Sequence, residues 1–287
     1  MLANTSNKRY WRTYTPIAVA IVIVVAFFCS PYILVHSYGN GFKIVSINTE
    51  YLNNTEEPVY LYFNFYRLKN LKELKIYCNK NTNLKYLEKM HSLEKLTLTL
   101  IDCEGNYNSV LLNKMPYMKS VKDLTIVSFD GKAITESAKW VYNFPALEKL
   151  CIISHELIDI SGIQKFEKLK NLTISDINVG VLGTFDLNVL KKNKNLEELT
   201  VSTSSTNVPD TKGLSDLSSL VSLSIFSNNP QYDMNNIEKM TSLRNLKINY
   251  CGEKQDELVI VLDQRTVKFI QGLENFEYFH FQIIEAE

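Results

Sequence analysis

Histidines, cysteines and acidic residues are the side chains that could do chemistry in this 287-residue chain, so their spacing is tested first. HELID (155–159) begins like the zinc-binding motif HExxH, but Asp159 stands where the second histidine is required. Gly39-Asn40-Gly41 lacks the third glycine of a dinucleotide-binding loop, and neither a P-loop nor a GxSxG elbow occurs. Of the other histidines, only His280 is expected near a surface suited to ligands. The sequence therefore predicts no enzymatic activity.

Five cysteines are spread along the chain without a CxxC pair or a short Cys/His cluster, so we expect no metal site and no cofactor. Lys plus Arg and Asp plus Glu both number 31, which gives no overall positive charge to attract nucleic acid. A disulfide between Cys78 and Cys103 stays open as a possibility. No nucleic-acid partner is predicted.

The amino terminus is the sharpest compositional feature. Residues 1–15 carry three basic residues and no acid, and residues 16–35 then run for 20 residues without a charge. As a helix this run would span about 30 Å, the thickness of a bilayer's hydrocarbon core. The positive-inside rule places residues 1–15 in the cytoplasm and the rest of the chain outside. We expect a single-pass protein of the plasma membrane, bound to the lipid bilayer through residues 16–35.

A cleaved signal peptide is the alternative for this segment, and it would make the protein secreted. Its apolar run would be unusually long, and the best cleavage site follows Val35-His36-Ser37. In both cases the bulk of the chain is exported. A buried core helix is disfavoured because the run has no polar stripe.

Nine segments repeat one pattern of apolar residues, spaced three, three and two apart. They are 68–76, 90–98, 118–126, 144–152, 166–174, 193–201, 217–225, 240–248 and 273–281. Only Asn193 breaks the apolar rule. The second apolar positions are 71, 93, 121, 147, 169, 196, 220, 243 and 276, about 25.6 residues apart on average. This period lies within the roughly 20–29 residues of leucine-rich repeats.

A chain of this kind forms a coil in which each turn contributes one short strand to a parallel sheet. We therefore predict an α/β solenoid, a leucine-rich repeat coil with a parallel β-sheet on its concave face, after an N-terminal transmembrane helix. The predicted divisions are the tail (1–15), the membrane anchor (16–35), a linker and cap (36–67), and the repeats with a C-terminal cap (68–287). Within them, strands are expected at 42–47, 59–65 and 258–262, helical returns at 130–144 and 185–193, and a 3₁₀ or extended return at 154–166.

Two segments, ELIDISGIQKFEKLKNLTIS and TKGLSDLSSLVSLSIFSNN, resemble bacterial internalin-type leucine-rich repeats. The resemblance covers about 68–281 and implies the fold, not a particular ligand. It also implies an Asn or Cys after each strand, with side chains that bond the backbone along an inner ladder. Only Asn79, Asn228 and Cys251 match that position.

The outward residues of the strands form three rows on the concave face. The first begins Glu73, Lys95, Asp123, Lys149 and alternates in charge, which supports the alignment because opposite charges on neighbouring strands attract. These charges form either a self-neutralising ladder or an ion-pairing surface. The middle row is rich in Thr. Exposed aromatic and apolar side chains mark contact surfaces, and the candidate binding residues are Tyr77, Val127, Ile153, Phe226, Tyr278 and His280.

These observations predict a membrane-anchored extracytoplasmic protein that binds a protein or glycan through its concave face. The alternative is a structural or regulatory component of the cell envelope that acts on a membrane partner.

Overall fold

The computed structural model describes the strands, the returns and the turns between them. Its residues are 33–38, 41–47, 71–78, 82, 84–100, 112–128, 139–154, 160–176, 186–203, 212–227, 231–233, 237–250, 258–262, 264–279 and 281–285.

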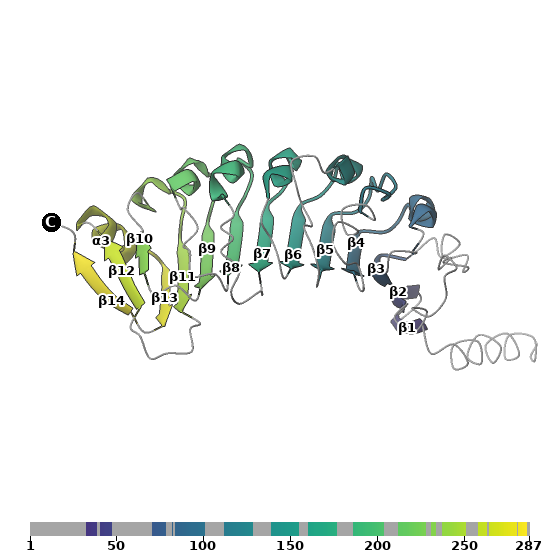
Figure 1. Ribbon diagram of the computed structural model, residues 1–287, viewed down its shortest axis with the longest axis horizontal. Helices are drawn as coiled ribbons and strands as arrows, with labels where there is room; N and C mark the ends of the chain where they lie inside the picture. Colours follow the sequence, from purple (N-terminus) through teal and green to yellow (C-terminus); the bar gives the residue numbers. More distant parts are fainter. Residues whose placement is uncertain are drawn as a thin grey trace, which may run out of the picture.

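One large sheet runs through the molecule, with its strands in sequence order (Figure 1). Its first two strands, β1 and β2, pair antiparallel, and all later neighbours pair parallel. The eleven strands are β1 (Ile33–Tyr38), β2 (Gly41–Ile47), β3 (Glu73–Cys78), β4 (Lys95–Leu100), β5 (Asp123–Ser128), β6 (Lys149–Ser154), β7 (Asn171–Asp176), β8 (Glu198–Thr203), β9 (Ser222–Ser227), β11 (Asn245–Tyr250) and β13 (Asn275–Phe279).

A second, three-stranded parallel sheet lies at the carboxyl end. It consists of β10 (Gln231–Asp233), β12 (Leu258–Leu262) and β14 (Phe281–Glu285). Each follows a strand of the large sheet, so each of the last three turns of the coil contributes two strands. The strand predicted at 258–262 is confirmed, but it belongs to this second sheet.

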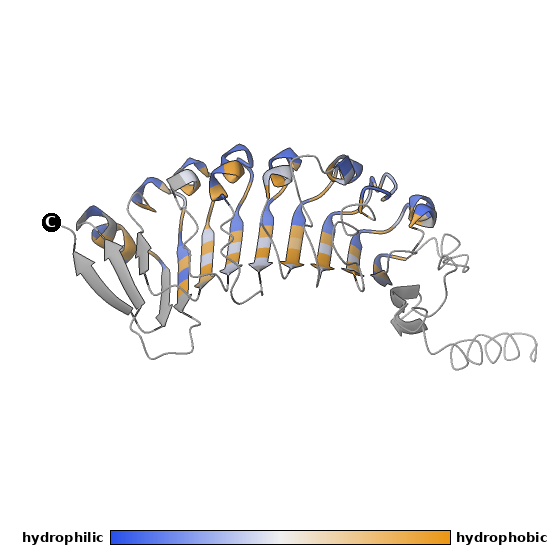
Figure 2. Ribbon diagram, in the orientation of Figure 1, coloured by the Kyte–Doolittle hydropathy of each residue, from blue (hydrophilic) through white to orange (hydrophobic). Residues whose placement is uncertain are grey.

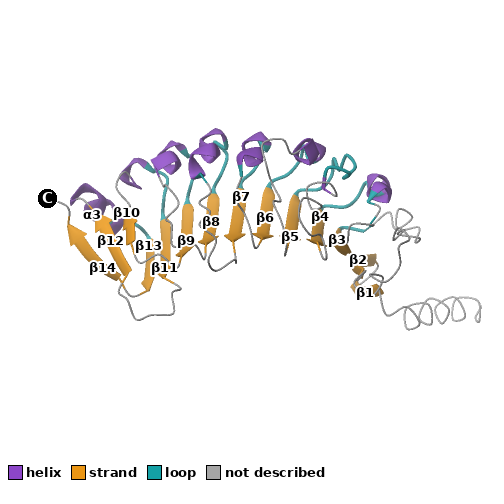
Figure 3. Ribbon diagram, viewed as in Figure 1, coloured by secondary structure: helices purple, strands orange, loops and turns teal. Residues whose placement is uncertain are grey.

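The returns between strands are mostly short 3₁₀ helices along the outer side of the curved row of strands (Figure 3). They are η3 (Lys85–Lys89), η4 (Lys139–Asn143), η5 (Ser161–Lys165), η6 (Leu187–Lys192), η7 (Lys212–Asp216) and η8 (Ile237–Lys239), followed by the α-helix α3 (Gln264–Gln271). A 3₁₀ helix has three residues per turn, so residues three apart point the same way. Ile160, Ile163, Phe166 and Leu169 follow that spacing and are all buried. The 3₁₀ return within 154–166 is confirmed, and the described parts of the two predicted helical returns are also 3₁₀.

The core is a stack of columns, one residue per turn. The predicted second apolar column, from Leu71 through Leu243, is buried to 1% exposure or less at all eight positions. Along the strands, buried and half-exposed residues alternate, as the banded strands of Figure 2 show. Because a single turn cannot cover its own apolar edge, each turn depends on its neighbours for burial.

The ninth repeat unit is aligned differently from the prediction. β13 pairs with β11 so that Leu246 faces Phe276 and Ile248 faces Tyr278, which shifts the unit by three residues. Leu273 then falls in the column of Leu243. Ile270, at 7% exposure, takes the column of Met240. The apolar spacing of residues 270–278 satisfies the repeat pattern as well as that of 273–281, and the end of α3 at Gln271 favours the earlier alignment.

The amino-terminal prediction needs one correction. β1 begins at Ile33, so residues 33–35 form part of a strand and not of a transmembrane helix. Residues 16–32 lie outside the described residues, and so does the predicted strand 59–65. Among the residues that are described, no helix is long and apolar enough to cross a bilayer. The strand predicted at 42–47 is confirmed as β2.

Candidate binding surface on the open sheet

We call the side of the large sheet that points away from the core the open face; it corresponds to the predicted concave face. From β3 to β9, it is formed by the first, third and fifth residues of each strand. From β3 to β9, the strands pair in register without a bulge, so these residues form the three continuous rows that the sequence predicted.

The first row neutralises its own charges. Lys95 Nζ lies 3.6 Å from Asp123 Oδ2 and 4.0 Å from Glu73 Oε1, on the two neighbouring strands. Further along, Asn171 donates a hydrogen bond to the Glu198 carboxylate. The self-neutralising ladder is therefore present at the start of this row.

A second charged row, which sequence reasoning missed, stands one residue before each strand. It reads Lys72, Glu94, Lys122, Glu148, Lys170, Glu197, Val221, Arg244, Glu274. Its ion pairs join Lys72 to Glu94, Lys170 to Glu148 at 3.7 Å, and Arg244 to Glu274 at 3.9 Å. The Lys72 ammonium, by its hydrogen bond and its charge, lowers the pKa of Glu94. The alternation of charge at a fixed offset from the repeat was the available signal.

The backbone explains why this second row is so regular. At each step from Lys72 to Val221, the carbonyl oxygen accepts hydrogen bonds from two successive N–H groups of the next turn. For example, Lys72 O accepts from Glu94 N and Lys95 N, both at 2.9 Å. This shared acceptor holds consecutive turns at one spacing, and the side chains at that position therefore lie beside each other.

The middle row is neutral over its central strands. Thr97, Thr125, Thr173 and Thr200 are half-buried, as is the Cys151 thiol among them. Burial, and then the nearby Asp123 carboxylate, raise the pKa of Cys151. A neutral, weakly nucleophilic thiol in this position suits packing better than catalysis.

The third row contains the predicted apolar residues, but they do not form one patch. Val127 and Ile153 are direct neighbours on β5 and β6, and both are half-buried. Two serines, on β7 and β8, separate Ile153 from Phe226. One threonine, on β4, separates Tyr77 from Val127. The structure therefore brings only Val127 and Ile153 together.

Two of the predicted binding residues are not placed on this surface. In the backbone register, Tyr278 pairs with Ile248, and the row that contains Asn245 continues at Asn275 instead of Tyr278. His280 lies outside the described residues.

Polar residues at the carboxyl end of the strands form a column that the sequence analysis did not identify. Ser128 and Ser154 are fully buried at neighbouring positions, and Thr203 is 4% exposed in the same column. The predicted Asn/Cys ladder would begin one residue later, at positions outside the described part. Cys103 is also outside it, so the question of a disulfide with Cys78 stays open.

Asn193, the single exception to the apolar rule, ties two turns together. It is 1% exposed, and its Nδ2 donates to the carbonyl oxygens of Ile163 at 3.2 Å and Phe166 at 3.0 Å. Its Oδ1 has no hydrogen-bond partner within the described part of the chain. The residue therefore replaces an apolar contact with two hydrogen bonds to the preceding return.

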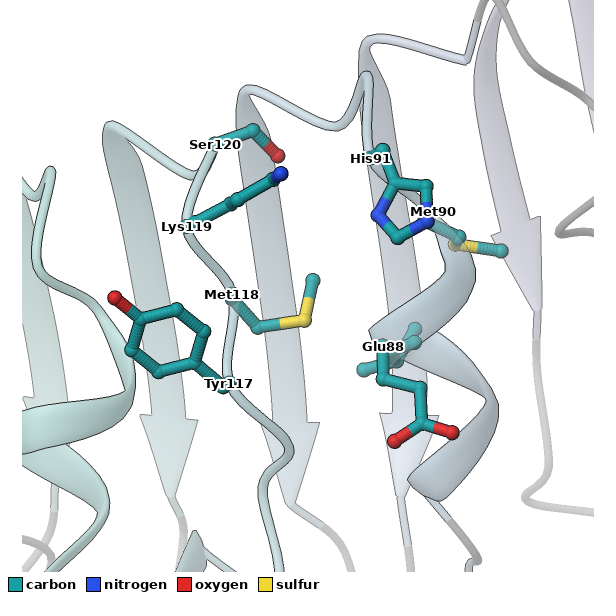
Figure 4. A pocket seen from close by; sticks show the side chains of 8 residues that line it. Glu88, Met90, His91, Tyr117, Met118, Lys119 and Ser120 are labelled. Atoms are coloured by element: carbon teal, nitrogen blue, oxygen red, sulfur yellow. The ribbon is translucent and has the colours of Figure 1, made fainter.

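A hollow of about 180 Å³ opens between the returns that precede β4 and β5 (Figure 4). Its apolar lining residues are Leu87, Met90 and Met118, and its other lining residues are Glu88, His91, Tyr117, Lys119 and Ser120. No nucleophile with an orienting base is formed by these lining residues. Across the described ranges, no three His, Cys, Asp or Glu side chains gather in a way that could hold a metal ion.

No family model and no curated protein matches this sequence. Solved structures with a similar course of the chain include internalin C2 of Listeria monocytogenes, at 16% identity and a TM-score of 0.46, over 71% of this chain and 80% of that one. A leucine-rich repeat protein of Leptospira interrogans has 16% identity and a TM-score of 0.41, over 79% and 65%. TLR13 in complex with single-stranded RNA has 13% identity and a TM-score of 0.48, over 77% of this chain and 30% of TLR13.

The buried columns and the strand register of this chain define its fold independently of these likenesses. The expected resemblance to internalin-type repeats holds at the level of the fold. The chain is a leucine-rich repeat solenoid.

Proposed function

We propose that the protein is a non-enzymatic binding protein that docks a partner protein or glycan on its open face. The observation that carries the proposal is the in-register run of half-buried side chains on β3 to β9, with Val127 and Ile153 side by side and neutral threonines next to them. A leucine-rich repeat fold does not determine a ligand, so these surface residues carry the argument.

The open face is large enough for one partner. The eight strands from β3 to β9 and β11 extend across roughly 34 Å at the usual strand spacing, and six residues of strand are about 20 Å long. That is roughly 700 Å², close to the 800 Å² or so that one partner contributes to a standard interface. A protein would use the Val127 and Ile153 pair as its apolar centre, and the rows of ion pairs would form a polar rim.

The proposal includes export and membrane anchoring. The uncharged run predicted as the anchor, residues 16–35, and the basic residues before it motivate this part of the proposal. Cleavage after Ser37 would remove most of β1 from its pairing with β2, which supports retention of the segment over a cleaved signal. The protein is then a single-pass plasma-membrane protein with its repeats outside the cell and no nucleic-acid partner.

The test compares two variants of the full-length protein on the cell surface. Val127→Asp with Ile153→Asp introduces two charges at the proposed centre, and Tyr142→Asp places one at an aromatic residue on the return η4 that is 63% exposed and lies off the open face. Both sites are solvent-accessible, and melting curves check that each variant folds. Proteins and glycans captured by the wild type are identified by mass spectrometry.

Loss of the captured partner in the double variant, with retention in Tyr142→Asp, is the expected result. Buried charges at an interface centre typically weaken binding by about tenfold or more. Undiminished capture by a folded double variant would remove the open face as the binding site.

A further inference from the structure

The hollow between the returns that precede β4 and β5 gathers polar side chains that have no partner within the described part of the chain. They are Glu88, His91, Tyr117, Lys119 and Ser120. None of these side chains forms a hydrogen bond or an ion pair with another described residue. The hollow therefore presents hydrogen-bonding groups that are available to a ligand.

Two later turns show how the same step of the coil is closed elsewhere. Asn195 Nδ2 donates to the Glu167 carbonyl oxygen at 2.8 Å, and Ser242 Oγ donates to the Ser218 carbonyl oxygen at 2.6 Å. Ser120 holds the same position in its own turn, one residue before the second apolar column. Its hydroxyl makes no such bond to a described residue, so it stays accessible in the hollow.

The polar groups at one end of the hollow are hydrogen-bond donors. In Figure 4, the Lys119 ammonium and the Ser120 hydroxyl extend from the turn before β5 towards the His91 ring on the turn before β4. A histidine ring has an N–H donor in either protonation state. The Glu88 carboxylate lies at the other end of the labelled side chains. One anionic group between Lys119 and His91 would be bound both by charge and by hydrogen bonds.

The apolar lining limits what the anionic group can be attached to. Leu87, Met90 and Met118 supply this lining and are 6% exposed or less. The volume of about 180 Å³ is close to that of a cavity of about 150 Å³ that accepts a benzene molecule. Methionine side chains adapt their shape to a neighbour and make favourable contacts with aromatic rings. A ligand with one ring and one negative charge therefore fits both the size and the lining.

We propose that this hollow binds a small carboxylate that carries an apolar ring, such as an aromatic carboxylic acid. The carboxylate accepts hydrogen bonds from Lys119, Ser120 and His91, and the ring packs against the two methionines. Glu88 disfavours a second negative charge on the ligand. The hollow lies on the returns and the open face on the strands, so the site does not depend on the partner proposed for the open face.

The experiment titrates benzoate into the full chain, with the methionine methyl groups labelled with carbon-13. The methyl resonances of Met90 and Met118 should shift to saturation, with a dissociation constant of about 1 mM, the affinity expected of so small a ligand. Met240 is 2% exposed and lies in the turn before β11, so its resonance should not move. Benzamide, which has nearly the same shape and no charge, should bind about fivefold more weakly or less.

Matched variants separate the role of the charge from an effect on the fold. Lys119→Gln should weaken benzoate binding about fivefold or more, because it removes the charged donor. Lys114→Gln changes an exposed lysine of the same return that does not line the hollow, and it should leave binding unchanged. Glu88→Gln should not weaken binding. All three side chains are exposed, so the variants are expected to fold, and an unchanged Met240 resonance checks this.

The carboxyl terminus of a peptide presents the same chemistry as a free acid. The peptide Gly-Gly-Phe, with a free carboxylate or amidated, distinguishes these two sources by the same methyl shifts. Tighter binding of the free peptide than of benzoate would assign the hollow to a protein terminus. Weaker binding of the peptide would assign it to a small free acid.

Three outcomes would overturn the proposal. The first is a benzoate shift that does not saturate or that is as large at Met240 as at Met90. The second is equal binding of benzamide and benzoate, and the third is undiminished binding by a folded Lys119→Gln variant. Because these resonances report on the hollow alone, failure of this proposal can be distinguished from failure of docking on the open face.

Discussion

Replacing Asn193 with Asp tests how much one buried amide contributes to the cohesion of the coil. The change keeps the shape of the side chain but removes both N–H donors to Ile163 and Phe166 and substitutes an acceptor that faces two carbonyl oxygens. Each lost hydrogen bond costs about 1 kcal/mol. A buried, uncompensated charge costs about 3–5 kcal/mol.

The introduced carboxyl group has a less costly option, which is to take up a proton. Protonation at pH 7 of a group whose unfolded pKa is about 3.9 costs roughly 4 kcal/mol, and the neutral carboxyl can then donate one hydrogen bond again. We therefore expect the free energy of unfolding to fall by about 3–5 kcal/mol at pH 7.

The pH dependence follows from the same argument. The folded-state pKa of the new carboxyl is raised, so its contribution to stability is fully present below about pH 3.9 and is lost as pH rises towards the raised value. Between these limits the variant should lose up to about 1.4 kcal/mol per pH unit relative to the wild type. Near pH 4 only about 1 kcal/mol of the deficit should remain, for the one donor that is not replaced.

Urea unfolding from about pH 4 to pH 7 measures this, with far-UV circular dichroism and tryptophan fluorescence, to which Trp140 contributes, as probes. Trp140 is fully buried and packs edge-on against Phe144, at 6.0 Å between ring centroids. Asn195→Asp is the matched control, because Asn195 Nδ2 donates at 2.8 Å to the Glu167 carbonyl from an exposed position. That variant should lose about 1 kcal/mol or less at every pH. A loss below about 1 kcal/mol for Asn193→Asp at pH 7, or one that does not change with pH, would refute the reasoning.

Three further predictions concern other features of the coil. Leu169→Ala, in the buried second apolar column, should lower the free energy of unfolding by about 2–5 kcal/mol in urea melts, and a loss below about 1 kcal/mol would contradict the shared core. Because Lys72 lowers the pKa of Glu94, the ion pair stabilises the fold above the unfolded pKa of Glu94, and this contribution disappears as pH falls. Glu94→Gln should remove this loss of stability at acid pH, as measured by melting curves at several pH values. An unchanged pH dependence would show that the pair has no influence. Burial and then Asp123 raise the pKa of Cys151, so its thiol should react slowly with a disulfide reagent at neutral pH and faster in Asp123→Asn, whereas equal rates would exclude the influence of Asp123.

The periodicity of the apolar residues alone was sufficient to predict which residues are buried inside the coil. Apolar residues at steps of three along a return and two along a strand permit only one side of the chain to be buried, so the column from Leu71 to Leu243 and the outward rows of β3 to β9 could be predicted. The same periodicity left the ninth unit ambiguous, because residues 270–278 satisfy the pattern as well as 273–281 do. There the pairing of β11 with β13 decides the register.

Which surface residues are neighbours depended more on the tertiary structure than on the sequence. Sequence identifies which residues point outward, but not which of them pack against each other across strands; the pairing of Val127 with Ile153 and the isolation of Phe226 follow from strand order. The two hydrogen bonds of Asn193 join residues about thirty positions apart in the sequence, and they form only when the returns stack. The repeat determines the fold because buried positions recur at a fixed period along the chain. Contacts between turns follow no such period, and they form only when the turns stack.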